Sequence, residues 1–243
     1  MEIKSEYVTL DVSDGTKMQA WTARPVGAGK HPGLFVFQEA FGVNAHIRDV
    51  TERFAREGYV AISPELYHRT APPGFSVSYD DYPALAPHIN ALNRAASEAD
   101  QKAAHGWLRA NIAAESPVAA AGFCMGGTAA FSTALNLPVA CAVSFYGGTI
   151  APNKRGPGLL DRVNELHGPV LLFWGGLDKN IPPEQVATVT DALRKAGKTF
   201  VNVDISDADH GFFCDARASY SAKAAAIAWP LTLAFLKTHC GQA

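Results

Sequence analysis

The sequence predicts an α/β fold with a mostly parallel central sheet of about eight strands and helices on both faces. Short apolar runs rich in Val, Ile and Phe recur from about residue 7 to residue 205. In the second half of that span they alternate with longer stretches of helical periodicity, which is typical of parallel βαβ units. Runs such as GLFVF at 33–37 are apolar throughout, as expected for strands that are covered on both faces.

Eight segments fit strands, and the first two differ from the rest. They flank the sequence SDGTK, whose Asp-Gly pair is a turn signal, so we expect an antiparallel hairpin at a sheet edge. The expected strands are 7–12, 18–24, 33–38, 59–63, 117–123, 141–145, 170–174 and 200–205.

Helical periodicity is clearest in 44–57, where Ile47, Val50 and Phe54 recur after Asn44, a residue that can cap the helix. Pro230 lies inside the last helical segment, so we expect a kink there or two abutting helices. Residues 67–93 are rich in Pro, Tyr and Ser and lack clear periodicity, which favours a binding or lid loop. The other expected helices are 97–114, 127–136, 183–195 and 219–239.

Composition and charge narrow the class of protein. The 243 residues fit one α/β core, so a single domain spanning 1–243 is expected. With 21 Lys and Arg against 23 Asp and Glu, the net charge is −2, and no general basic field exists to bind nucleic acid. No stretch approaches the roughly 20 apolar residues that a membrane helix needs. We therefore expect neither a nucleic-acid nor a membrane partner.

The chain has four cysteines: Cys124, Cys141, Cys214 and Cys240. They show neither CxxC pairing nor zinc-like spacing, and they are too few for a disulfide scaffold. The first ten residues carry charges where a signal peptide has its apolar region. These features favour a cytoplasmic protein, in a reducing compartment where a reactive thiol can persist.

The segment AAAGFCMGGTAAF at 119–131 is typical of a nucleophile elbow with Cys124 as the nucleophile. Gly122 and Gly126, two residues before and after it, leave room for a sharp strand-to-helix turn. At a helix N-terminus, the exposed N–H groups and the helix dipole favour a thiolate. The alternative is a buried structural cysteine in a glycine turn. The coincidence of strand, glycine spacing and helix favours the nucleophile.

A base and an acid follow in the chain order that this elbow requires. Asp178 comes after the strand VLLFW, and His210 comes after the next strand, in SDADHGFF. In open α/β sheets, ligands bind outside the carboxyl ends of the strands, where all three side chains are expected. The competing acids near His210 are Asp204, Asp207, Asp209 and Asp215, but a carboxylate adjacent in sequence rarely reaches the imidazole at the required angle. The remaining histidines are more typical of surface or capping groups: His31, His46, His68, His88, His105, His167 and His239.

Four ordered motifs, QEAFGVN at 38–44, GFCMGG at 122–127, GGLDKNIPP at 175–183 and HGFF at 210–213, together resemble the dienelactone hydrolase family. These are bacterial α/β-hydrolases that open enol-lactones. The resemblance covers nearly the whole chain and implies an α/β-hydrolase fold without a large cap domain. It also implies that Glu39 contacts the resting cysteine and moves when substrate binds.

Glu39 and the backbone after it have more than one interpretation. Because Glu39 ends the run GLFVFQ, it can face the nucleophile, although a carboxylate is also favoured near the start of the following helix. This fold builds its oxyanion hole from the N–H after the nucleophile and one from the loop after the third strand. These correspond to the backbone amides of Met125 and Ala40.

The substrate-binding pattern of the family is only partly present. Family members grip a substrate carboxylate with arginines, one of them four residues after the catalytic histidine, where this chain has Cys214. Arg217 is the nearest arginine. The other family arginine falls where the chain has Tyr79, Asp80, Asp81 and Tyr82. Arg69 and Tyr146, both in expected post-strand loops, are further candidates, with a hydrogen-bonding staple and a core tyrosine as the alternatives.

The sequence thus predicts a cysteine-dependent hydrolase that opens an enol-lactone or activated ester through a thioester. Its expected partner is a small lactone or ester, a monomer is favoured, and no cofactor or metal is needed. The alternatives are a general carboxylesterase or thioesterase with a different acyl pocket, and a non-catalytic binding protein on a hydrolase scaffold. A metal hydrolase is disfavoured because the chain has neither HExxH nor a paired His/Asp cluster.

Overall fold

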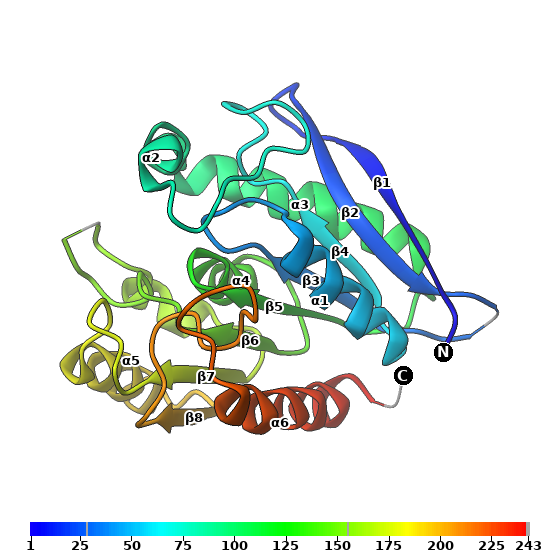
Figure 1. Cartoon of the computed structure of the whole chain (residues 1–243). Helices are drawn as coiled ribbons and strands as arrows, with labels where there is room; N and C mark the ends of the chain where they lie inside the picture. Colours follow the sequence, from blue (N-terminus) through cyan, green and yellow to red (C-terminus); the bar gives the residue numbers. More distant parts are fainter. Residues whose placement is uncertain (28, 155, 242–243) are drawn as a thin grey trace. The chain divides into compact units, whose positions relative to one another are not determined.

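The computed structural model describes residues 1–27, 29–154 and 156–241. The chain, whose helices and strands are labelled in Figure 1, divides into two compact units, the first comprising Met1–Ala119 and the second beginning at Ala120. The expectation of a single domain over 1–243 stays a prediction.

The first unit contains the predicted hairpin and two further strands. Strands β1 (Ile3–Asp11) and β2 (Lys17–Pro25) pair antiparallel, as predicted. Strand β4 (Val60–Pro64) pairs antiparallel with β2 and parallel with β3 (Gly33–Phe37). Every residue of β3 and β4 is buried, which explains their uniformly apolar sequences.

Three helices accompany these strands. Helix α1 (Ala45–Arg56) begins where Asn44 accepts a hydrogen bond from the backbone N–H of Ile47 at 3.2 Å, and it packs against β2 and β4. The helix buries Ile47, Val50 and Phe54, the side chains whose spacing predicted it. Helix α3 (Arg94–Asn111) contacts β3 and β4.

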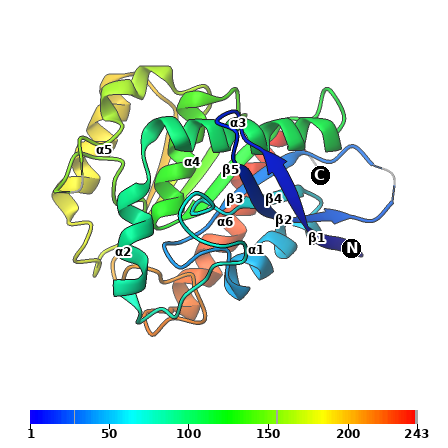
Figure 2. The ribbon, with the colours of Figure 1, turned by 90° about the horizontal axis from the view of Figure 1, so that it is seen from above.

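The prediction of a loop over 67–93 is wrong in part, because this segment contains helix α2 (Tyr82–Ala91), which a short connection joins to α3 (Figure 2). The side chain of Asp81 caps α2 by accepting from the N–H of Ala84. Leu85 is the one residue of α2 that is buried. A helix that buries so little leaves no apolar periodicity in its sequence, so the pattern could not indicate it.

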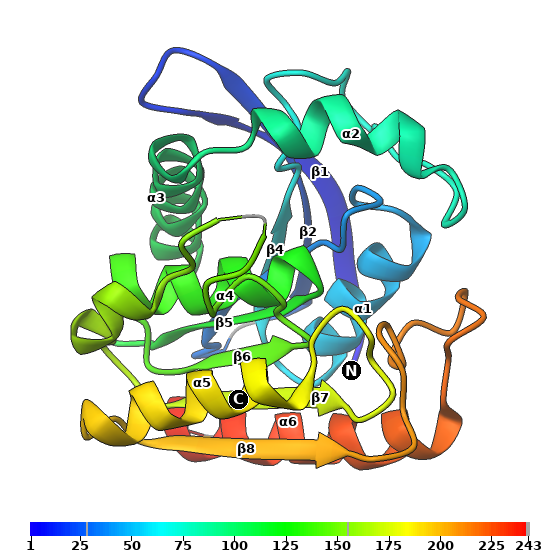
Figure 3. The same ribbon diagram turned by 90° about the vertical axis from the view of Figure 1, so that its left-hand side faces the viewer.

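The second unit is built around four parallel strands (Figure 3). Their order is β5 (Val118–Phe123), β6 (Ala142–Phe145), β7 (Val170–Gly175) and β8 (Phe200–Ile205). The first three are fully buried, whereas β8 is mostly exposed. In the described part of the chain, the strand pairings within the two units are mostly parallel, as predicted.

The strand ends of the second unit are held in register by aromatic stacking. Phe123, Phe145 and Phe173 pair across β5, β6 and β7, with ring centroids 4.7 and 4.5 Å apart. The residues that follow these phenylalanines therefore emerge side by side at the carboxyl edge of the sheet. Such an edge is where ligand sites of parallel sheets form.

The second unit contains the three expected helices and, in addition, a 3₁₀ turn that was not expected. Of the two alternatives expected at Pro230, a kink or two abutting helices, the second is wrong. Helix α6 runs continuously through this proline and is not two abutting helices. Proline removes one intrahelical hydrogen bond, from its own missing N–H to the carbonyl of Ala226, and Ala226 is exposed, so water can bond that carbonyl instead. The helical segments are α4 (Met125–Asn136), the 3₁₀ turn η1 (Leu160–Glu165), α5 (Pro183–Lys195) and α6 (Ala222–Cys240).

The lengths and apolar content of the helices also bear on membranes. Among the described residues, no helix is both long and apolar enough to cross a membrane.

Candidate active site

Cys124 lies between the end of β5 and the start of α4, in the strand–turn–helix arrangement expected of a nucleophile elbow. Its backbone has φ 55° and ψ −117°, in a region that non-glycine residues rarely adopt. The N–H of Cys124 donates to the carbonyl of Phe145 at 3.0 Å, and its own carbonyl accepts from the N–H of Gly127 at 2.9 Å. These bonds hold the strained turn from both sides.

Gly127 is a requirement of the elbow that the sequence reasoning missed. A Cβ at this position would lie 2.5 Å from the backbone oxygen of Phe145 and 3.2 Å from the Cα of Gly147. Glycine therefore lets the first turn of α4 approach the end of β6. The signal was present as the second glycine of the GG pair in GFCMGG.

Cys124, His210 and Asp178 form a hydrogen-bonded row. The Nε2 of His210 lies 3.1 Å from the Sγ of Cys124, and its Nδ1 lies 2.6 Å from Oδ2 of Asp178. The other carboxylate oxygen of Asp178 accepts from the N–H of Asn180 at 2.8 Å. Asp209, a competitor for the acid, instead accepts from the backbone N–H of His210 and is exposed. The row thus has the order and contacts of a nucleophile, base and orienting acid.

Burial and nearby charges shift the pKa of the His210 imidazole in opposite directions. The side chain of His210 is 14% exposed and that of Asp178 is 1% exposed. Burial opposes the protonation of His210, but the charge of Cys124 and the hydrogen bonds with Asp178 and Cys124 outweigh it. They raise the pKa of His210 from 6.5 to about 10. The contacts of His210 therefore favour its protonated form near neutral pH.

Comparison with known proteins decides the family. A model described as "Dienelactone hydrolase family" matches residues 18–240. A Synechocystis sp. protein named "Putative carboxymethylenebutenolidase" is 37% identical over 236 residues, which are 94% of each chain. The chain belongs to the dienelactone hydrolase family. An Escherichia coli relative with the same name is 35% identical over 239 residues, 95% of this chain and 86% of its own.

The crystal structure of a similar protein supports the fold of this dienelactone hydrolase family member. The crystal structure named "Putative Dienelactone Hydrolase", from Klebsiella pneumoniae, has a TM-score of 0.87 and 34% identity to this chain. The match covers 96% of this chain and 98% of the Klebsiella pneumoniae chain. The predicted α/β-hydrolase class is confirmed, and the chain is an enzyme of this family, a carboxylic ester hydrolase.

Glu39 and Ala40 follow β3 in the first unit, and a network within that unit fixes their backbone. The buried amide of Gln38 donates to the carbonyl of Glu39 at 3.1 Å and accepts from the N–H of Leu66 at 3.2 Å. Because a peptide is planar and trans, fixing the carbonyl of Glu39 also fixes the direction of the Ala40 N–H. The hydroxyl of Tyr67 donates to the carbonyl of Ala40 at 2.9 Å. Sequence reasoning did not assign this role to Gln38.

The three candidate substrate-binding residues lie in different surroundings. The guanidinium of Arg69 donates to both oxygens of the buried Asp100, at 2.9 and 2.8 Å, and also pairs with Asp14. Arg217 lies against Gly211, since a Cβ there would be 2.5 Å from its Cζ. Tyr146 is buried, with its ring centroid 5.0 Å from that of His210. Their roles toward substrate stay predictions.

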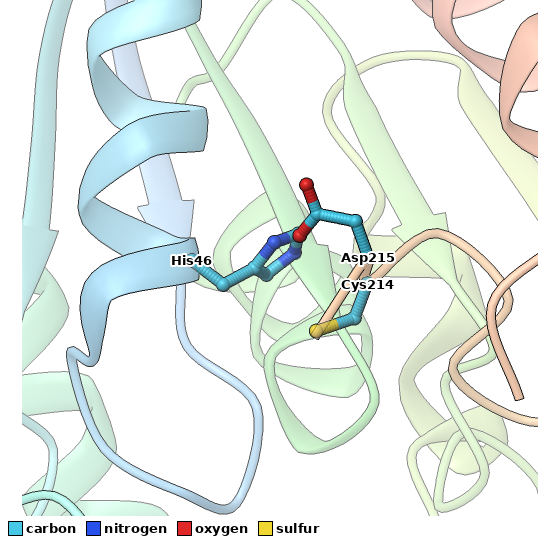
Figure 4. A group of neighbouring side chains, drawn as sticks. All are labelled: His46, Cys214 and Asp215. Atoms are coloured by element: carbon cyan, nitrogen blue, oxygen red, sulfur yellow. The ribbon is translucent and has the colours of Figure 1, made fainter. Parts of the chain in front are cut away.

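Cys214 lies four residues after His210, where the family resemblance implies an arginine. It is buried and is followed by the exposed Asp215 (Figure 4). A buried thiol there cannot replace the charge of an arginine, so any anion must be bound by other residues. His46, which Figure 4 also labels, lies in the first turn of α1.

Replacing Cys124 with alanine is expected to lower the pKa of His210 from about 10. The Cys124 charge and hydrogen bond raise this pKa and would both be lost, whereas the opposing effect of burial would remain. His210 would then lose its proton at a lower pH than in the wild type. An NMR titration of the histidine rings measures this, with His210→Gln as the control that assigns the resonance. If the titration midpoint of His210 were the same in Cys124→Ala as in the wild type, an ion pair between His210 and Cys124 would be contradicted.

Proposed function

We propose that this enzyme opens an enol-lactone, or cleaves a similarly activated ester, through a thioester on Cys124. The observation that carries the proposal is the row of contacts from Cys124 to His210 to Asp178, at 3.1 and 2.6 Å. A thiolate beside an imidazolium is a nucleophile paired with its proton donor, which is the arrangement that covalent catalysis needs.

The reaction then has two halves. The thiolate of Cys124 attacks the ester carbonyl, and the oxyanion accepts hydrogen bonds from the amides of Met125 and Ala40. Collapse breaks the C–O bond and leaves the acyl group as a thioester, while His210 gives its proton to the departing oxygen. In a lactone, this oxygen stays tethered to the acyl chain.

Hydrolysis of the thioester completes the cycle. His210, now neutral, takes a proton from water as the water attacks the thioester carbonyl. Collapse of the second tetrahedral intermediate releases the carboxylic acid and restores the thiolate of Cys124. Asp178 keeps the imidazole oriented in both halves, because it holds Nδ1 while Nε2 faces the reacting atoms.

The choice of substrate rests on leaving-group chemistry. A thiolate attacks simple esters poorly and suits a good leaving group such as an enolate. The names of the Synechocystis and Escherichia coli relatives refer to an enzyme of this substrate class. Glu39 is assigned the family role of contacting the resting cysteine. Arg69 pairs with Asp14 and Asp100, so binding a substrate carboxylate would require its guanidinium to give up one of these ion pairs. Arg217 stays the other candidate for this role.

A panel of substrates tests the proposed activity. The values of kcat/KM are measured for an enol-lactone, an aryl ester, an alkyl ester and an acyl thioester. The proposal expects the enol-lactone to react fastest and the alkyl ester slowest. Faster turnover of the aryl ester or the thioester would instead favour a general carboxylesterase or thioesterase.

Iodoacetamide is expected to label Cys124 before the other three cysteines. Cys124 is partly exposed, whereas Cys141 and Cys214 are fully buried and Cys240 is 7% exposed. A hydrogen bond with Cys240, together with burial, raises the pKa of Cys141, and the same bond lowers the pKa of Cys240. Cys240 is therefore the strongest competitor, and Cys240→Ser is the matched control. Time-resolved peptide mapping measures the order, and earlier labelling of another cysteine would count against an activated Cys124.

A further inference from the structure

Tyr146 shares with Cys124 a positive φ, which is unusual for a residue other than glycine. Among the described residues, Cys124 and Tyr146 are the two non-glycine residues with positive φ, at 55° and 41°. Each follows the last residue of a strand, and those last residues, Phe123 and Phe145, pair across β5 and β6. The N–H of Tyr146 donates to the carbonyl of Phe173 at 2.8 Å, just as the N–H of Cys124 donates to that of Phe145. Tyr146 is thus the counterpart of the nucleophile one strand away.

A left-handed backbone is costly for a bulky aromatic residue. A glycine at position 146 would adopt this φ without strain. The hydrogen bond to Phe173 uses backbone atoms alone, so it does not require a tyrosine. We therefore expect contacts of the Tyr146 side chain to offset the free-energy cost of its strained backbone.

The ring of Tyr146 lies against the catalytic imidazole. Its centroid is 5.0 Å from that of His210, with the two planes inclined at 56°. The ring also packs against Phe212 in an edge-to-face contact at 5.3 Å, and it is completely buried. A cation within about 6 Å of a tyrosine ring centroid is attracted to the negative face of the ring. The centroid of the His210 ring lies within this distance.

The two hydrogen bonds of His210 lie at the edge of its ring. Neither contacts the ring faces, so only packing can hold those faces in place. Nδ1 bonds Asp178 and Nε2 bonds Cys124, so both ring nitrogens are engaged. Rotation of the imidazole about the line between these partners is not prevented by either bond. A rigid, buried aromatic ring against the imidazole restricts that rotation.

We propose that Tyr146 is a positioning residue whose ring holds the His210 imidazole in line with Cys124 and Asp178 and stabilises its protonated form. The role in turnover rests on the proposed cysteine mechanism, whereas the contact with the imidazolium does not. Tyr146 acts through His210 and needs no contact with the reacting carbonyl.

The test changes the charge distribution of the ring while keeping its shape. Phenylalanine and its successively fluorinated analogues are placed at position 146, because ring fluorination weakens the negative π face with little change in size. The pKa of His210 is measured by NMR, together with kcat and KM. Tyr146→Phe is expected to retain the wild-type pKa of His210. The most fluorinated ring is expected to lower it by about one unit, which corresponds to about 1.4 kcal/mol.

A leucine variant and its matched control separate positioning from packing. Tyr146→Leu is expected to lower kcat about tenfold with KM changed less than about twofold, and to lower the pKa of His210. Phe212→Leu removes a neighbouring ring and is expected to lower the melting temperature while leaving that pKa unchanged. A His210 pKa that does not respond to fluorination would overturn the proposal. Because the pKa is read without substrate, this failure is distinct from a failure of the cysteine mechanism, which would appear as activity in Cys124→Ala.

Discussion

Cys124→Ala is expected to lower kcat by about 10⁴-fold or more, because it removes the atom that forms the covalent intermediate. Residual hydrolysis would come from substrate binding and from the proposed oxyanion-hole amides. Single-turnover kinetics with an enol-lactone measure the loss, since they follow the chemical step without product release. Circular dichroism and thermal unfolding establish that the variant is folded.

The matched control for this loss is Cys214→Ala. Cys214 is fully buried on the loop after His210, and its thiol has no assigned role in the reaction. Its removal is expected to cost stability through a small cavity while kcat stays within about twofold of the wild type. If Cys124→Ala kept kcat within tenfold of the wild type, the assigned nucleophile would be wrong.

Asp178→Asn is expected to lower kcat by roughly 10³- to 10⁴-fold, the size of effect that the same change has in serine triads. An amide cannot stabilise the His210 imidazolium as a carboxylate does, and its NH₂ group can impose the wrong tautomer. The remaining amide oxygen can still accept from the N–H of Asn180, so the loop is expected to keep its conformation. Steady-state kinetics measure kcat, and NMR measures the pKa of His210. Both kcat and this pKa are expected to fall.

Asp209→Asn provides the control for the choice of acid. Asp209 precedes His210 directly but bonds its backbone N–H and not its ring. Its replacement is expected to leave kcat within about threefold and the pKa of His210 unchanged. A larger loss of kcat from Asp209→Asn than from Asp178→Asn would show that the acid has been assigned to the wrong residue.

Much of the fold was predictable because its strands carry strong local signals. The Asp-Gly turn predicted the hairpin of β1 and β2, and the apolar runs located β3, β5 and β7 to within one or two residues. Helix α2 was not predictable, because it buries Leu85 alone and has no apolar face. Its start depends on the Asp81 cap, a signal too short to distinguish a helix from a turn.

The row of Cys124, Asp178 and His210 was predictable because the carboxyl ends of parallel strands meet at one edge. The chain order then distinguished Asp178 from the acids adjacent to His210. The left-handed backbone of Tyr146 and the contact of its ring with His210 could not be read in the same way. They depend on the register of β6 against its neighbours and on the path of the loop after β8, which are tertiary features without a local sequence pattern.

The most direct test of the central claim is to trap the acyl-enzyme. Wild-type enzyme is mixed with an enol-lactone or a slowly hydrolysed aryl ester, quenched in acid at successive times, and mapped by mass spectrometry. The cysteine mechanism predicts that the acyl group appears on the peptide containing Cys124 and decays at the rate of turnover. An acyl group on any other residue, or an unmodified Cys124 throughout turnover of every substrate, would contradict it.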